Sequence, residues 1–145
     1  MKRFHYVTAL IVVVLITGSI FGRNRDPYSI KAPVVEHIFI RYDASSGELL
    51  ISDKQDGPET PAHSHKNSVK KGDRVQWNWR GPHRNMEMST VTPKDANPFS
   101  KVDKVGDHLV APIRTDIEDG DYGYNIVLII NGKSKTFDPT LQIHH

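Results

Sequence analysis

The sequence predicts an all-β protein, and three observations lead to this prediction. Apolar and polar residues alternate along several short segments, most clearly over 74–79, as in strands with one buried face. Turns containing glycine or proline separate these segments, and Asn131-Gly132 is a strong signal for a two-residue hairpin. Past residue 25, nothing in the chain looks like a helix.

The first 25 residues differ from the rest. Residues 1–6 form a short basic head, and residues 7–21 are almost wholly apolar. This pattern predicts an export signal or an N-terminal membrane anchor helix. Thr17 and Ser19 match a cleavage site only loosely, which favours the uncleaved anchor. A buried core helix is the third interpretation, and it lacks a helical partner elsewhere in the chain.

Charge and composition limit the partners. Four of the 19 basic residues precede Asp26, which leaves 15 basic against 17 acidic residues and a net charge of −2 after that point. The sequence pI of about 8.8 is therefore no sign of nucleic-acid binding. The chain has no cysteine, so no disulfide can stabilise the domain, and its stability must come from its apolar core.

The expected elements follow in order. Residues 26–33 are polar and read as a linker to a single domain over 34–145. The first two strands are expected at 34–42 and 49–51, joined as a hairpin through Ser45-Ser46-Gly47. Residues 52–67 contain Gly57, Pro58 and Pro61 and are predicted to be the most loop-like part of the domain.

A polar turn at 70–73 leads into the strand at 74–79, where Trp77 and Trp79 point the same way and are expected to pack between two sheets. Later strands are expected at 108–113, 120–126, 125–130, 133–137 and 141–143, with 125–130 the most central by its β-branched composition. Tyr122 and Tyr124 are expected to bury their rings and to find backbone partners for their hydroxyls.

Two stretches, Val69-Lys70-Lys71-Gly72-Asp73 with the strand that follows it and Gly120-Asp121-Tyr122-Gly123-Tyr124-Asn125-Ile126, resemble the cupredoxins, a family of small exported β-sandwiches. Val69-Lys70-Lys71-Gly72-Asp73, the following Val-x-Trp strand and Pro82-His83 resemble the family's first copper-ligand region. Residues 120–126, Gly-Asp-Tyr-Gly-Tyr-Asn-Ile, look like its Gly-x-Tyr-x-Tyr-x-Cys strand, and residues 138–143 look like its closing strand. The resemblance covers roughly 34–143. It implies a cupredoxin-like or immunoglobulin-like Greek-key β-sandwich.

The blue-copper site is not carried over with this resemblance. Ile126 stands where the family has its cysteine ligand, and residues 127–137 contain neither histidine nor methionine. Among the family's ligand positions, His83 alone has its match in this chain. No cofactor is therefore expected, with copper or zinc as the alternative.

Two groups of residues are candidate metal ligands. His63 and His65 lie on one side of an extended chain, and neutral imidazole binds zinc and Cu(II). His83 is followed by Met86 and Met88, whose thioethers suit Cu(I). The other interpretation is that the two histidines belong to a solvated loop while the methionines fill the core.

The function is predicted from the motifs that the sequence lacks and from its expected fold and location. The chain has no phosphate-binding glycine loop, no nucleophile elbow and no His-Glu-x-x-His helix, so an enzyme is not expected. We expect a non-catalytic binding or assembly module in the periplasm or at the cell surface, tethered to the membrane if residues 1–25 stay uncleaved. Its unidentified protein partner would use the rim loops or an open sheet edge. The alternative is a periplasmic copper- or zinc-binding protein, in which loop 52–67 would fold over the rim that carries His83.

Overall fold

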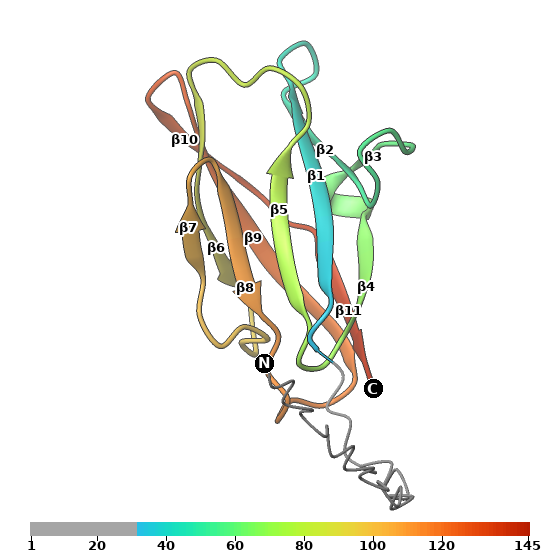
Figure 1. The fold of residues 1–145 in the computed structure, drawn as a ribbon. Coiled ribbons are helices and arrows are strands. Elements are labelled where there is room, and N and C mark those ends of the chain that lie inside the picture. The colour runs from blue at the N-terminus through green and yellow to red at the C-terminus, as the bar shows by residue number, and fades with distance from the viewer. Residues whose placement is uncertain (1–31) are drawn as a thin grey trace, which may run out of the picture. The chain divides into compact units, whose positions relative to one another are not determined.

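The computed structural model describes residues 32–145, which fold as two packed β-sheets (Figure 1). The first sheet has the order β3 (Thr60–Pro61), β2 (Glu48–Ser52), β1 (Val35–Asp43), β5 (Arg74–Trp79), β8 (His108–Pro112) and β7 (Asp103–Val105). The second has the order β10 (Lys133–Phe137), β9 (Gly120–Ile130), β11 (Thr140–His144) and β4 (Lys66–Lys70), and β6 (Met86–Pro93) also pairs with β9. The all-β prediction is confirmed. The predicted signal or anchor helix over 1–25 and most of the predicted linker lie outside the described residues.

Both sheets are mixed. β1 runs parallel to β5, β4 runs parallel to β11, and the other pairs are antiparallel. Two predicted hairpins are confirmed, β1 with β2 and β9 with β10. Asn131 and Gly132 connect the second hairpin with φ angles of 50° and 75°, the positive values that such a turn needs at both positions.

The core lies between the sheets and is centred on three aromatic rings. Trp77 on β5 and Tyr124 on β9 face each other with ring centroids 5.7 Å apart, and Phe99 packs edge-on against both. The Trp77 Nε1–H donates a hydrogen bond to the Tyr124 hydroxyl at 3.1 Å. Burial raises the pKa of Tyr124 well above its usual value. The expected burial of Tyr124 is thus confirmed, but its partner is a side chain. Tyr122 does donate to a backbone carbonyl, that of Glu118, at 2.8 Å.

Segment 52–67 is more ordered than the sequence predicts. It contains β3, the short 3₁₀ helix η1 (Ala62–Ser64) and the start of β4. Glu59 holds it to the first sheet, because its carboxylate receives the Arg41 guanidinium through two nitrogens and lies 3.3 Å from Arg80. Arg80 also donates to the carbonyl of Gly57 at 2.8 Å. These contacts fasten the segment to the strand end that precedes His83.

Replacing Glu59 with glutamine is expected to lower the free energy of unfolding by about 1 kcal/mol at neutral pH. Hydrogen bonds from Arg41 hold the pKa of Glu59 below its usual value, against an opposing effect of burial. A lowered pKa means that this stabilisation is complete above the unfolded-state pKa of about 4.3 and is lost as the pH falls through the folded-state value. The difference between wild type and Glu59→Gln should therefore shrink in acid.

Urea unfolding at neutral pH and at about pH 3 measures this difference. Glu48→Gln is the matched control, because Glu48 is exposed and its carboxylate has no ion pair within residues 32–145. We expect the control to stay within about 0.5 kcal/mol of wild type at both pH values. An effect of Glu59→Gln that is equally large in acid would show that charge plays no part in it.

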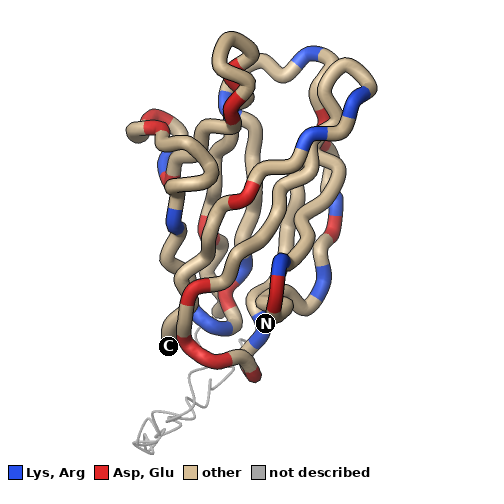
Figure 2. The backbone as a smooth tube through the Cα atoms, turned by 180° about the vertical axis from the view of Figure 1, so that it is seen from behind, with Lys and Arg blue, Asp and Glu red and all other residues tan. Residues whose placement is uncertain are grey.

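Charges of both signs are interspersed along the backbone (Figure 2). An acidic run, Asp116, Glu118 and Asp119, lies in the connection between β8 and β9, and a carboxylate oxygen of Asp119 lies 3.5 Å from Nε2 of His145. Within residues 32–145, no helix has the length and apolarity that a membrane crossing needs.

Candidate functional site

A pocket of about 280 Å³ opens beside His83, at the end of the sandwich where β5 ends and β6 begins. Both sheets contribute to it, together with the turn between β7 and β8. We call it the Trp79 pocket, and its lining residues are Trp79, His83, Met86, Glu87, Met88, Lys104, Gly106 and Asp107. Three of the five sequence-predicted metal ligands therefore line one cavity.

The strand period explains why Met86 and Met88 share the face that borders this pocket. Met86 and Met88 are two positions apart on β6, so their side chains leave the same face, the one that packs against the core. Met88 is fully buried beside the interior, and Met86 lies half-buried one step nearer the rim. On the opposite sheet, Trp79 follows Trp77 by the same period and is half-buried at the same end. The two strands thus place an indole ring across from two thioethers.

The His83 ring is held by stacking. It lies parallel to the Trp79 ring, with an interplanar angle of 4° and centroids 4.9 Å apart. Gly81, with φ of 77°, turns the chain ahead of it, and the Met86 N–H donates to the His83 carbonyl at 3.0 Å. The Nε2 atom lies 3.7 Å from an Asp107 carboxylate oxygen, too far for a hydrogen bond. This nitrogen is therefore available to a ligand.

His65 has a different environment. Its side chain is 8% exposed, and both ring nitrogens are occupied. Nδ1 lies 2.7 Å from the Thr60 hydroxyl, and Nε2 lies 3.1 Å from an Asp53 carboxylate oxygen. His63, two residues earlier, is exposed on η1. The pair separates into one buried, hydrogen-bonded ring and one solvated ring, so they do not face a common ligand.

If loop 52–67 folded over the rim that carries His83, as the metal-binding alternative requires, the imidazoles of His63, His65 and His83 could meet, but the structure does not bring them together. Among residues 32–145, no three histidine, aspartate or glutamate side chains gather closely enough to hold a metal ion. Segment 52–67 does contact the strand end before His83, through Glu59 and Arg80. That contact is a salt bridge between Glu59 and Arg80. It does not bring His63 or His65 to His83, and the three histidines form no shared site. A site at His83 therefore depends on the thioethers of Met86 and Met88.

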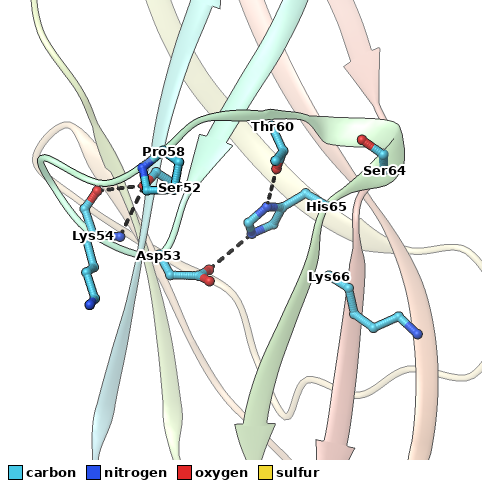
Figure 3. Close-up of a pocket in the computed structure, with 8 residues that line it drawn as sticks. All are labelled: Ser52, Asp53, Lys54, Pro58, Thr60, Ser64, His65 and Lys66. Carbon is cyan, nitrogen blue, oxygen red and sulfur yellow. Dashed lines mark hydrogen bonds and ion pairs between the residues drawn. The ribbon is translucent and has the colours of Figure 1, made fainter.

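A second and larger pocket, of about 520 Å³, lies beside His65 (Figure 3). Asp53 at the end of β2, Thr60 on β3 and His65 ahead of β4 converge on it. Asn67 on β4 also donates to the Asp53 carboxylate, which fixes that side chain from a second direction. We call this cavity the His65 pocket, and its lining residues are Ser52, Asp53, Lys54, Pro58, Thr60, Ser64, His65 and Lys66.

Sequence reasoning missed Asp53 and Thr60 as partners of His65. No spacing rule joins these positions, because the hairpin of β2 with β3 brings them together in space. The pairings of Leu50 with Pro61 and of Ile51 with Thr60 set this register. The one feature of the sequence that could have indicated polar partners for His65 was the polar character of the segment around it.

Comparison with known proteins adds no family to this description. No protein-family model matches the chain, and no curated protein matches it significantly. The resemblance to the cupredoxins stays a prediction that rests on the motifs quoted above.

Proposed function

We propose that this chain is an exported or membrane-tethered cupredoxin-like Greek-key sandwich that serves as a non-catalytic binding module, and that it binds Cu(I) in the Trp79 pocket. The observation that carries the proposal is the convergence of His83, Met86 and Met88 on one cavity. The fold assignment is supported by the chain's repeated crossing between sheets, from β4 to β5, to β6 and then to β7. Export is supported by the apolar segment at 7–21.

The ligand chemistry favours copper over zinc. Thioether sulfur is a soft ligand that suits Cu(I), whereas zinc sites use thiolate, imidazole and carboxylate, usually four together. The Trp79 pocket offers two thioethers and one imidazole nitrogen with no close hydrogen bond. The half-buried position of Met86 and the burial of Met88 would keep the ion away from water.

A protein partner that adds a strand is less well supported. The outer strands β3 and β7 of the first sheet have two and three residues. β4 at the edge of the second sheet carries exposed Lys66 and Lys70 on one face. Short and lysine-bearing edges are the usual means of preventing strand addition, so β3, β7 and β4 do not favour a partner strand. The eight-residue β6, which is paired with β9, is the longer edge. A partner that docks through the rim loops remains compatible with copper binding, since the Trp79 pocket opens on that rim.

Titration of the full chain with Cu(I) against a competing chelator tests the proposal. His144→Gln and His145→Gln remove the terminal histidine pair from the measurement. We expect binding of one ion per chain and a rise in melting temperature with Cu(I), because a ligand that binds the native state stabilises it. Zinc should bind at least about tenfold more weakly. Absence of stoichiometric Cu(I) binding would refute the proposed function.

A further inference from the structure

The His65 pocket holds a hydroxyl, an imidazole and a carboxylate in one hydrogen-bonded chain. Thr60 Oγ1 lies 2.7 Å from His65 Nδ1, and His65 Nε2 lies 3.1 Å from Asp53 Oδ1. Figure 3 shows the three side chains pointing toward one another across the pocket. A nucleophile, its base and an orienting acid are joined in this order in acyl-transfer sites, and here the two ring nitrogens have exchanged roles, with Nδ1 facing the hydroxyl and Nε2 facing the carboxylate.

The direction of each hydrogen bond follows from the donors available. An ionised carboxylate can only accept, so the proton of the neutral imidazole lies on Nε2 and is donated to Asp53. Nδ1 then has a free lone pair and accepts the proton of the Thr60 hydroxyl. Asn67 donates to the same Asp53 oxygen, and the low exposure of His65 restricts its ring. The network thus fixes the tautomer in which His65 can act as a base.

We propose that Thr60 is a nucleophile that accepts an acyl group from a small activated ester bound in the His65 pocket. Thr60 Oγ1 attacks the ester carbonyl, its proton passes to His65 Nδ1, and a new Oγ1–C bond forms. The ester C–O bond then breaks, and the leaving alcohol takes the proton from His65 Nδ1. The product is an acyl ester of Thr60. The site is separate from the Trp79 pocket and goes beyond copper binding.

Exposure and size fit this role. Thr60 is exposed on the two-residue edge strand β3, so an acyl donor can reach its hydroxyl, while its base is buried. A pocket of about 520 Å³ lies within the range of small-molecule sites. Ser64 serves as an internal comparison: it lines the same pocket, but its hydroxyl donates to the carbonyl of Pro61 and has no imidazole partner.

The test is acylation of the full chain by p-nitrophenyl acetate, with the modified residues located by peptide mass spectrometry. We expect acetylation at Thr60 to be at least about 100-fold faster than at Ser64, the gain that a positioned base supplies. Thr60→Ser should keep the reactivity and Thr60→Val should abolish it at this position. Residue 60 is exposed and Thr60→Ser keeps the hydroxyl that meets the buried His65 Nδ1, so this change should not disturb the fold.

Asp53→Asn separates activation by His65 from mere exposure of the hydroxyl. The amide carries no charge, so it no longer stabilises the imidazolium that forms when His65 takes the proton of Thr60. We expect acetylation of Thr60 to slow by at least about tenfold while that of Ser64 stays unchanged. Equal rates at Thr60 and Ser64, or a Thr60 rate unaffected by Asp53→Asn, would overturn the inference and leave the network a structural one.

Discussion

Replacing Trp77 with alanine is expected to lower the free energy of unfolding by about 3–5 kcal/mol. Its side chain is fully buried between the sheets, in contact with the rings of Phe99 and Tyr124. The substitution would leave a cavity that strand backbones cannot close, and it would strip the buried Tyr124 hydroxyl of its indole donor. A loss of this size is a large share of the 5–15 kcal/mol typical of a domain.

Urea unfolding of wild type, Trp77→Ala and Trp79→Ala measures the effect. Trp79 is the matched control, because it is the same residue type on the same face of β5 but half-buried at the rim. We expect Trp79→Ala to cost about 1–2 kcal/mol. Tyr124→Phe isolates the hydrogen bond and should cost about 1–3 kcal/mol, because it leaves the Trp77 N–H buried without an acceptor. Equal losses from the two tryptophan variants would mean that the core is not centred on Trp77.

The strands that could be predicted are those whose pattern is local. Over 74–79 the alternation of side chains assigned both the strand and its buried face, and Asn131-Gly132 indicated its hairpin through a backbone requirement. Segment 52–67 could not be predicted in this way. Its order comes from contacts distant in sequence, such as Glu59 with Arg41 and Arg80, which no periodicity records.

The candidate sites also differ in whether their residues are related by a local pattern or by the folding of separate elements. The Met86 and Met88 face was readable from the sequence, because two residues on one strand share a side whatever the rest of the chain does. The stacking of His83 on Trp79 could not be predicted from the sequence, since it depends on how the loop after β5 folds back on the end of that strand. Likewise, the sequence offered His65 as a metal ligand or as part of a solvated loop, and neither interpretation included a buried hydrogen-bond network, because its partners Asp53 and Thr60 come from other elements. A lone histidine in a polar segment does not reveal whether it is buried.

His83→Ala is expected to weaken Cu(I) binding by about 100-fold or more. Loss of a partner that merely orients a ligand costs about 10–100-fold in metal affinity, and His83 would be a ligand itself. The substitution removes the one imidazole among the residues that line the Trp79 pocket, and with it the ring stacked on Trp79. The fold should survive, because His83 lies in the loop between β5 and β6 and contributes nothing to the buried core.

Competition titrations of four variants measure this effect and identify the ligands. Met86→Leu and Met88→Leu replace each thioether with a hydrocarbon of similar volume, so they should cost less than about 1.5 kcal/mol in stability. Each should nevertheless weaken Cu(I) binding by at least about tenfold, because the soft ligand is lost. His63→Ala is the matched control, an exposed histidine outside the Trp79 pocket, and should leave the affinity unchanged. If His63→Ala weakened binding as much as His83→Ala did, the ion would be held by scattered surface imidazoles and the Trp79 pocket would not be its site.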